Sequence, residues 1–435
     1  MNSLTRLSLC LAGVVLWIVT VPAGPGLPAG GEAEPDERAR AIMRTVPLVD
    51  GHNDLPWAVR ELAHYDFSTI DIRVSQPKLH TDIPRLRAGL VGAQFWSVYV
   101  PSRLAGQGDV TATLEQIAAV HELARRYPDV FAIAGTAADV RRIFGSGRIA
   151  SMMGMEGGHS IDSSLPALRM MYHLGARYMT LTHSASTPWA DSATDQPKLG
   201  GLSRFGEVVV REMNWLGMLV DLSHASPDTM ADAIRVSDAP VIFSHASARA
   251  LCDVPRNVPD EVLRTLPANG GIVMVTFVPD FISPEFAAWG RRAREVRQAL
   301  RKEHAGDDTA QRAAVDRWTA VHPPPKVTLA QVADHVDHIR RVAGVDHLGI
   351  GSDFDGINSV PAGLEDVSRF PALVAELFRR GYSDEDVRKI IGLNALRVME
   401  RAEQVAARLQ AQRGPSTATI EDLDGKHDDP TEVRP

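Results

Sequence analysis

Cysteine, basic runs and long apolar segments are scarce in this chain of 435 residues, and each scarcity excludes a class of protein. The only two cysteines, Cys10 and Cys252, cannot build a disulfide framework. A net charge of −8 without a Lys/Arg-rich run argues against nucleic acid as a partner, because nucleic-acid binding normally requires a basic face. With 44% hydrophobic and 23% charged residues, the composition is that of a folded globular protein rather than a disordered chain.

Several familiar catalytic motifs are also missing from the sequence. There is no Gly-x-Ser-x-Gly elbow of the kind that presents a serine nucleophile. His121-Glu122 lacks the second histidine of the helical zinc-protease motif, and the pair Gly349-x-Gly351 is weak support for a dinucleotide site. The chemistry must therefore come from another set of residues.

The first 23 residues have the features of a signal peptide. Arg6 supplies a short positive region, residues 7–21 are apolar, and Val21-Pro22-Ala23 offers small or modest side chains at a cleavage site. An uncleaved membrane anchor is the alternative, although such an anchor usually needs ~20 apolar residues. No segment after Ala23 is long and apolar enough to span a bilayer. We therefore expect export to the periplasm or the extracellular space, with Cys252 left as a free, buried and inert thiol.

The remainder divides into an N-terminal arm at 24–45, a catalytic domain at 46–412 and a tail at 413–435. The tail is rich in Pro, Ser, Thr and Asp and lacks an apolar cluster, which predicts disorder. The chain has no apolar C-terminal extension, so we expect no C-terminal lipid anchor.

Short apolar segments recur through the catalytic domain and predict eight strands. Several are continuous apolar runs rather than alternating ones, as in parallel strands that are covered on both faces. The predicted strands are residues 48–50, 93–100, 149–155, 178–182, 218–222, 241–243, 272–277 and 347–351.

Amphipathic helical patterns fill most of the gaps between these strands, including 113–126, 205–215 and 228–234. Thr328 and Gln331 form a capping box that opens a helix to about Val342. Repeated strand–helix alternation predicts an α/β fold, a TIM-like (β/α)8 barrel, with a doubly wound sheet as the alternative.

Two additions to the barrel are expected. A long, charged excursion at 280–325 separates the seventh and eighth predicted strands, and we expect it to be helical and to lie at the rim or flank. Closing helices are expected after the last strand, at 371–380, 384–391 and 395–412.

Metal-ligand residue types follow six of the predicted strands. The C-terminal ends of barrel strands share one face, where catalytic groups converge. His52 and Asp54 are two residues apart in extended backbone, so both side chains point to the same side. The polar residues at the strand ends are His52, Asp54, Glu156, His159, His183, Asp221, His224, His245, Asp353 and Asp355.

This combination of imidazoles and carboxylates is typical of zinc, which binds nitrogen and oxygen ligands. Several such ligands, with one carboxylate able to bridge, suit two ions that polarise a carbonyl and hold a hydroxide. Met152, Met153 and Met155 are interpreted as strand core rather than a soft-metal site, because the other ligands are hard or borderline.

Four motifs together resemble the renal (membrane) dipeptidase family, over about residues 46–401. The motifs are Val49-Asp50-Gly51-His52-Asn53-Asp54, Glu156-Gly157-Gly158-His159, Asp221-Leu222-Ser223-His224 and Gly351-Ser352-Asp353-Phe354-Asp355-Gly356. The resemblance implies a barrel with two zinc ions per chain that cleaves free dipeptides through a hydroxide bridging the metals. Family members accept dipeptides with a C-terminal D-residue, and some open the β-lactam of carbapenems. The resemblance also suggests a homodimer, although the sequence shows no interface.

The same resemblance implies a role for each site residue. His52 and Asp54 would bind one zinc, His224 and His245 the other, and Glu156 would bridge the two. His183 would steady the carbonyl oxygen as it becomes an oxyanion. Arg256 would grip the free carboxylate of the substrate. Asp353 would bind the substrate amine and pass a proton to the departing nitrogen.

Two departures from the family pattern bear on specificity. Phe281 stands where the family pattern leads us to expect a tyrosine beside the carboxylate clamp, which removes a hydroxyl donor. The excursion at 280–325 is also longer than expected and would reshape the lid of the pocket.

Two other functions remain open from the sequence. A related two-metal amidohydrolase would act on N-acyl amino acids and would not require a free amine. A secreted barrel that only binds metal or peptide is the non-enzyme alternative, although pure binding needs neither Asp353 nor His183. The cluster of Asp334, His335, Asp337 and His338 is interpreted as a solvated helix face rather than a further metal site.

Overall fold

The computed structural model describes residues 34–425. The predicted signal peptide at 1–23 and the last ten residues, 426–435, lie outside the described residues. Within the predicted N-terminal arm, α1 (Pro35–Met43) is helical and packs mainly against α15 (Phe370–Arg379).

Eight parallel strands form a closed barrel, as predicted. Their order is β2-β1-β9-β8-β7-β6-β5-β4, and a further pairing of β2 with β4 closes the ring. This closure excludes the doubly wound sheet, which is open. The barrel strands are β1 (Leu48–Asn53), β2 (Val91–Tyr99), β4 (Ile149–Glu156), β5 (Ala176–Thr180), β6 (Leu219–Asp221), β7 (Ile242–Ala246), β8 (Ile272–Val275) and β9 (Leu348–Ile350).

Each of the eight predicted strands overlaps one barrel strand, and a ninth strand was not predicted from the sequence. This strand, β3 (Phe131–Ile133), pairs in parallel with the start of β4 and lies outside the ring. With three residues, it is too short to give a recognisable periodic signal.

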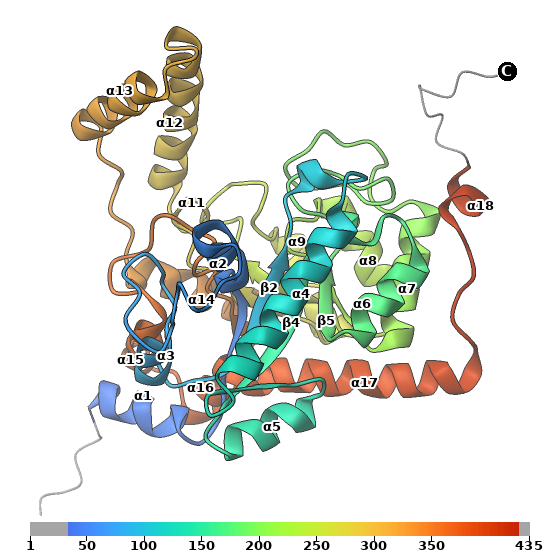
Figure 1. Cartoon of the computed structure of the whole chain (residues 1–435). Helices are drawn as coiled ribbons and strands as arrows, with labels where there is room; N and C mark the ends of the chain where they lie inside the picture. Colours follow the sequence, from blue (N-terminus) through green and yellow to red (C-terminus); the bar gives the residue numbers. More distant parts are fainter. Residues whose placement is uncertain (1–33, 426–435) are drawn as a thin grey trace, which may run out of the picture. The chain divides into compact units, whose positions relative to one another are not determined.

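Helices surround the barrel, and their boundaries follow local sequence signals (Figure 1). Thr328 and Gln331 form the predicted capping box at the start of α14. The helices before and around the barrel are α2 (Leu55–Ala63), α3 (Ile83–Ala88), α4 (Asp109–Arg126), α5 (Ala137–Gly145), α6 (Leu165–His173), α7 (Arg204–Leu216), α8 (Pro227–Val236), α9 (Asp260–Leu263), α10 (Leu266–Asn269) and α14 (Leu329–Ala343).

The predicted excursion is helical and follows β8. It contains α11 (Pro279–Ile282), α12 (Pro284–Glu303) and α13 (Asp308–Val321), and Figure 1 shows α12 and α13 extending away from the barrel. The rings of Trp318 and His322 stack with centroids 4.9 Å apart, and Trp289 of α12 lies 6.0 Å from Trp318. Ala314 is the single buried residue of α13, so α13 is held mainly by its contacts with α12.

The C-terminal part closes the fold as predicted with α15, α16 (Asp384–Arg388) and α17 (Asn394–Gln412). A π-helical turn (Lys389–Leu393) joins α16 to α17. Leu396 and Met399 of α17 are buried in one cluster with Val49 and Met274 of the barrel.

Residues 413–425, where the sequence predicted disorder, are ordered and pack against α7. Ser416 donates its backbone N–H to Glu212 over 3.0 Å, and the Ser203 hydroxyl donates to Asp424 over 2.5 Å. The short helix α18 (Ile420–Asp424) buries Ile420. The composition predicted disorder because the segment lacks an apolar cluster. It is held instead by one buried isoleucine and a few side-chain hydrogen bonds, which composition does not reveal.

Within residues 34–425, no helix combines the length and the apolar character needed to cross a membrane.

Candidate active site

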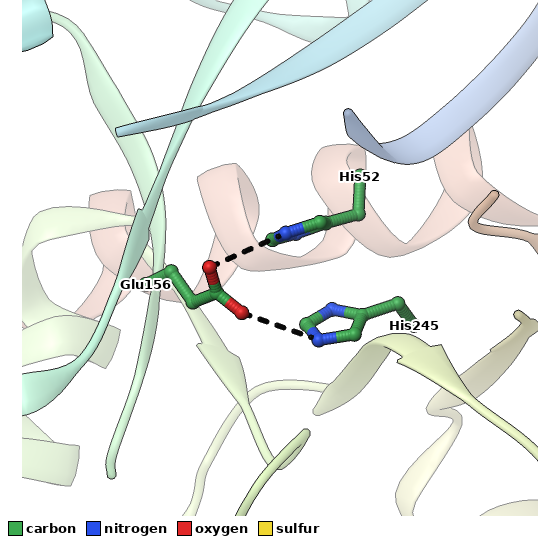
Figure 2. Close-up of side chains that lie close together, drawn as sticks. All are labelled: His52, Glu156 and His245. Carbon is green, nitrogen blue, oxygen red and sulfur yellow. Dashed lines mark ion pairs between the residues drawn. The ribbon is translucent and has the colours of Figure 1, made fainter. Parts of the chain in front are cut away.

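The predicted metal ligands converge at the C-terminal ends of the barrel strands. His52 lies in β1, Glu156 ends β4, and His245 lies in β7. Figure 2 shows the carboxylate of Glu156 between the rings of His52 and His245. Residues far apart in sequence are brought together because all strands of a barrel end on one face.

The two oxygens of Glu156 face different groups of histidines. Oε2 lies 3.5 Å from Nε2 of His52, while Oε1 lies 3.0 Å from Nε2 of His224 and 3.3 Å from Nε2 of His245. The Ser97 hydroxyl also donates to Oε2 over 3.3 Å. Glu156 is therefore the shared member of two neighbouring sets of ligand atoms.

The first set consists of His52, Asp54 and Glu156, with Asp353 nearby. Nε2 of His52 lies 3.3 Å from Oδ2 of Asp54. Nε2 of His52 and Oδ1 of Asp54 are buried without a hydrogen-bond partner among the described residues. Buried polar atoms are normally paired, so unpaired nitrogen and oxygen atoms pointing at a common space fit a cation there.

The second set consists of His224, His245 and Glu156. The Nε2 atoms of the two histidines are 3.1 Å apart, and Nδ1 of His245 lies 2.9 Å from the Ser244 hydroxyl. His183 approaches the same carboxylate, with Nε2 3.7 Å from Oε1 of Glu156. Facing imidazole nitrogens beside a shared carboxylate again have the donor chemistry of a zinc site.

The charges of the site also favour a cation. Burial would raise the pKa of Glu156, but the imidazoles of His52 and His183 hold it well below the usual range. Burial would lower the pKa of His52, but Tyr178, Glu156 and Asp54 raise it well above the usual value. Burial lowers the pKa of His224 and His245 well below normal, which keeps them neutral and able to act as ligands.

Arg256 lies beside the second set with unused donors. The residue is 5% exposed, and its Nη1 has no hydrogen-bond partner among the described residues. Nη2 donates to the carbonyl of His245 over 3.4 Å, and burial lowers the pKa of the guanidinium to about 10. A buried guanidinium with free donors is suited to a carboxylate.

A pocket of about 530 Å³ opens next to Arg256. The ring of Phe281, which stands where a tyrosine was expected, lies 5.1 Å from the Arg256 guanidinium carbon and has no hydroxyl to offer a ligand. The lining residues are Ser184, Thr194, His224, Val254, Pro255, Arg256, Val278, Asp280, Phe281, Ala287, Arg291 and Arg294. The first part of the excursion therefore forms one wall of the pocket.

Asp353 is held in a constrained position next to the first set. Its backbone has a φ of 65°, a left-handed conformation that side-chain-bearing residues rarely adopt. A Cβ at Gly356 would lie 2.3 Å from Oδ2 of Asp54 and 2.6 Å from Oδ1 of Asp353, so only glycine fits between these carboxylates. Burial and the carboxylates of Asp54 and Glu156 raise the pKa of Asp353 well above the usual range, against the pull of His52. A carboxyl group of this kind is able to hold and release a proton.

The α14 cluster and Cys252 are two further features that the sequence singled out. The cluster on α14 belongs to no ligand set, but His335 is buried rather than solvated: Nδ1 accepts from the Ala248 N–H over 3.1 Å and Nε2 lies 3.0 Å from the Ile282 carbonyl. His338 pairs with Asp260 over 2.8 Å. Cys252 is free and buried as predicted, and burial raises the pKa of its thiol to about 11.

The residues that hydrogen-bond to the candidate metal ligands were not predicted from the sequence. Tyr178 contacts Nδ1 of His52 over 2.8 Å, Ser244 contacts Nδ1 of His245, and Ser97 contacts Glu156. Ser244 directly precedes a predicted ligand, which was a usable signal. No local sequence pattern distinguished Tyr178 from other aromatic residues in strands, because its contact with His52 forms only in the closed barrel.

Known proteins are similar to this chain in sequence and in fold. A family model described as membrane dipeptidase (peptidase family M19) matches residues 36–413. Dipeptidase ataJ of Aspergillus terreus is 40% identical over 403 residues, covering 86% of this chain and 89% of that protein. Dipeptidase 3 of Mus musculus is 41% identical over 374 residues, covering 85% and 67%.

A solved structure extends the comparison to a liganded protein. The metallo peptidase from Rhodobacter sphaeroides, liganded with a phosphinate mimic of the dipeptide L-Ala-D-Ala, is 26% identical with a TM-score of 0.67, and the match covers 82% of this chain and 99% of that one. The sequence match, the barrel and the cluster of histidines and carboxylates agree: the chain belongs to the membrane dipeptidase family, peptidase family M19, and is a metallodipeptidase.

Proposed function

We propose that this metallodipeptidase uses two zinc ions per chain to hydrolyse the peptide bond of free dipeptides. His52 and Asp54 would hold one ion, His224 and His245 the other, and Glu156 both. The observation that carries this proposal is the carboxylate of Glu156, which presents one oxygen to His52 and the other to His224 and His245. When bound, two zinc ions would polarise the scissile carbonyl and lower the pKa of a bound water, which would supply a nucleophile without a serine or cysteine.

The protein side chains would bind and orient the dipeptide. Arg256 would pair with the free carboxylate through its unused Nη1 donor. Burial lowers the pKa of His183, so its ring is neutral, and a protonated Nε2 would donate to the carbonyl oxygen as negative charge develops there.

Asp353 would complete the reaction at the other end of the substrate. Its carboxyl group would bind the free amine and then pass a proton to the departing nitrogen as the C–N bond breaks. Water adds across that bond: its oxygen goes to the carbonyl carbon, and the leaving nitrogen becomes an amine. A carboxylate clamp and an amine clamp together limit substrates to two residues.

A C-terminal D-residue is part of the proposal. The Rhodobacter sphaeroides relative is liganded with a mimic of L-Ala-D-Ala, which supports acceptance of this stereochemistry by the shared fold. We further propose export directed by residues 1–23 and a homodimer, on the sequence pattern and the family resemblance. N-terminal sequencing of exported protein and sedimentation would test these two points.

Hydrolysis of the matched pair Gly-D-Ala and N-acetyl-Gly-D-Ala by zinc-reconstituted protein tests the function. Cleavage of only the free dipeptide would support both clamps. Cleavage of the blocked compound at an equal or better rate would instead favour an amidohydrolase that acts on N-acyl amino acids. Hydrolysis of neither compound, with two zinc ions bound, would overturn the proposed substrate class. A carbapenem in the same assay would test β-lactam opening.

A further inference from the structure

Tyr178 lies inside the barrel and reaches a proposed metal ligand on the opposite side. It belongs to β5, whose neighbours in the barrel are β4 and β6, whereas His52 belongs to β1 between β2 and β9. Both residues are fully buried, and the Tyr178 hydroxyl lies 2.8 Å from Nδ1 of His52. The contact therefore crosses the barrel interior rather than following the sheet.

Gly154 and Phe95 determine where the Tyr178 ring can lie. Gly154 of β4 is the direct strand partner of Tyr178, and a Cβ at Gly154 would lie 1.9 Å from Cζ of the tyrosine ring. The ring of Phe95 lies 5.0 Å away on the β2 side. The tyrosine ring is thus fixed by a glycine below it and an aromatic neighbour beside it, with its hydroxyl directed at β1.

The hydrogen bonds around the hydroxyl determine which nitrogen of His52 carries a proton. The Tyr178 hydroxyl donates to the carbonyl of Gly51 over 3.1 Å. Because a hydroxyl has one proton, it then accepts from His52, so Nδ1 of the imidazole must be the N–H donor. In the neutral ring that would bind a metal, Nε2 therefore keeps the lone pair, and it faces Asp54 and Glu156 at 3.3 and 3.5 Å.

We propose that Tyr178 is a positioning residue for the first metal: the relay from Nδ1 of His52 through the Tyr178 hydroxyl to the Gly51 carbonyl fixes the ring orientation and tautomer in which Nε2 binds zinc. Hydrogen bonds to the far nitrogen of a metal-binding histidine commonly have this effect. The other histidines do not share the relay, since Nδ1 of His245 contacts Ser244 and Nδ1 of His224 has no partner among the described residues. The effect is therefore specific to the ion held by His52 and Asp54. This inference rests on the two-metal site proposed above.

Tyr178→Phe in the full chain tests the proposal, because it removes the hydroxyl and keeps the ring. The matched control is Tyr127→Phe, which removes another buried hydroxyl, bonded to Asp71 over 2.9 Å outside the ligand sets. Zinc affinities are measured by competition with a chromophoric chelator, and melting temperatures are measured on the metal-free proteins. Visible absorption of the cobalt-substituted proteins reports the ligand geometry.

For Tyr178→Phe we expect one of two zinc equivalents to bind ~10–100-fold more weakly. The cobalt spectrum of that equivalent should change, and the metal-free melting temperature should match that of the control. Two equivalents as tight as in the wild type would overturn the role of Tyr178. So would equal weakening of both equivalents with a loss of metal-free stability, which would indicate a purely structural tyrosine. A wild-type protein that binds no zinc would instead refute the metal centre itself.

Discussion

The ligand cluster at the barrel strand ends and the α11–α12 part of the excursion meet at the pocket beside His224 and Arg256, but they differ in construction. The ligands on the barrel side are almost fully buried: His52 is 0% exposed, His245 1% and Glu156 5%. On the other side, Arg294 of α12 has a side chain that is 64% exposed, and its partner Asp280 lies 3.5 Å away. The barrel holds its groups from several strands, whereas α12 is attached to the domain mainly through α11 and its N-terminal half.

This difference suggests that the barrel determines the reaction and the excursion determines the substrate range. The groups proposed to bind metal and move protons lie in barrel strands or in the loops that directly follow them. A change there is therefore expected to disturb the fold and the reaction together. Phe281 and Arg291 of the excursion line the pocket and would face the rest of a bound substrate. Substitutions there can change substrate range while the ligand sets stay intact.

The largest expected effect is on the barrel side. Glu156→Gln removes the charge shared by both ligand sets, so zinc bound per chain should fall and kcat/KM should drop at least ~100-fold. Metal analysis after dialysis, with assay of Gly-D-Ala hydrolysis, measures both. The control is Glu212→Gln, a buried glutamate paired with Arg169 over 2.7 Å, which should keep its zinc. Unchanged zinc stoichiometry in the Glu156 variant would contradict the bridging role.

Arg256 lies where the two regions meet, and its loss should weaken substrate binding selectively. A hydrogen bond to a charged group contributes ~1.5–3 kcal/mol, so Arg256→Met should raise KM for dipeptides by roughly 10–100-fold with zinc content unchanged. Steady-state kinetics of Gly-D-Ala hydrolysis checks this. Arg291→Met, on the exposed side of the same pocket, is the comparison and should change KM less. Equal kinetics for the Arg256 variant and the wild type would place the carboxylate clamp elsewhere.

His335 joins the two regions, because it bonds both Ala248 after β7 and Ile282 of α11. Burial lowers its pKa from 6.5 to about 4. Between these values the unfolded chain binds a proton at His335 that the folded chain does not, so the free energy of unfolding falls as the pH falls. The loss from this residue reaches up to roughly 3 kcal/mol by pH 4.

Denaturant unfolding at pH 7 and pH 5 measures this loss. His335→Gln should lose less stability on acidification than the wild type, because glutamine does not titrate. His338→Gln, three residues further along α14, is the control and should retain the wild-type pH dependence from His335. An unchanged pH dependence in the His335 variant would show that other groups cause the acid sensitivity.

The smallest expected effect is on the excursion side. Phe281→Tyr adds a hydroxyl next to the Arg256 guanidinium, and one additional hydrogen bond is worth ~0.5–1.5 kcal/mol. KM for dipeptides should therefore fall by no more than about tenfold, with kcat unchanged. Phe281→Leu removes the aromatic face and should raise KM slightly, since a cation–π contact contributes ~0.5–1 kcal/mol at an accessible site. A higher KM for the tyrosine variant would mean that the hydroxyl obstructs the carboxylate.

Local apolar runs were sufficient to predict the eight barrel strands, although not the short β3, and motif order placed the candidate ligands at the strand ends. His52 lies in β1 and Asp54 directly follows it. His224 follows β6, and His245 lies in β7. The Tyr178–His52 contact joins residues 126 positions apart across the barrel, and nothing local marks it. The burial of His335 was missed for the same reason, since its partners come from β7 and α11 rather than from its own helix.

The packed segment at 413–425 has a practical consequence for recombinant work. Ser416 covers the buried carboxylate of Glu212, and Asp424 accepts from the hydroxyl of Ser203 at the start of α7. A fragment that stops at Gln412 would therefore uncover a charged interior group and remove the Asp424 carboxylate, which accepts from the Ser203 hydroxyl and the Phe205 N–H at the start of α7. Fragments for recombinant work should therefore extend at least to Gly425, so that these contacts to α7 are retained.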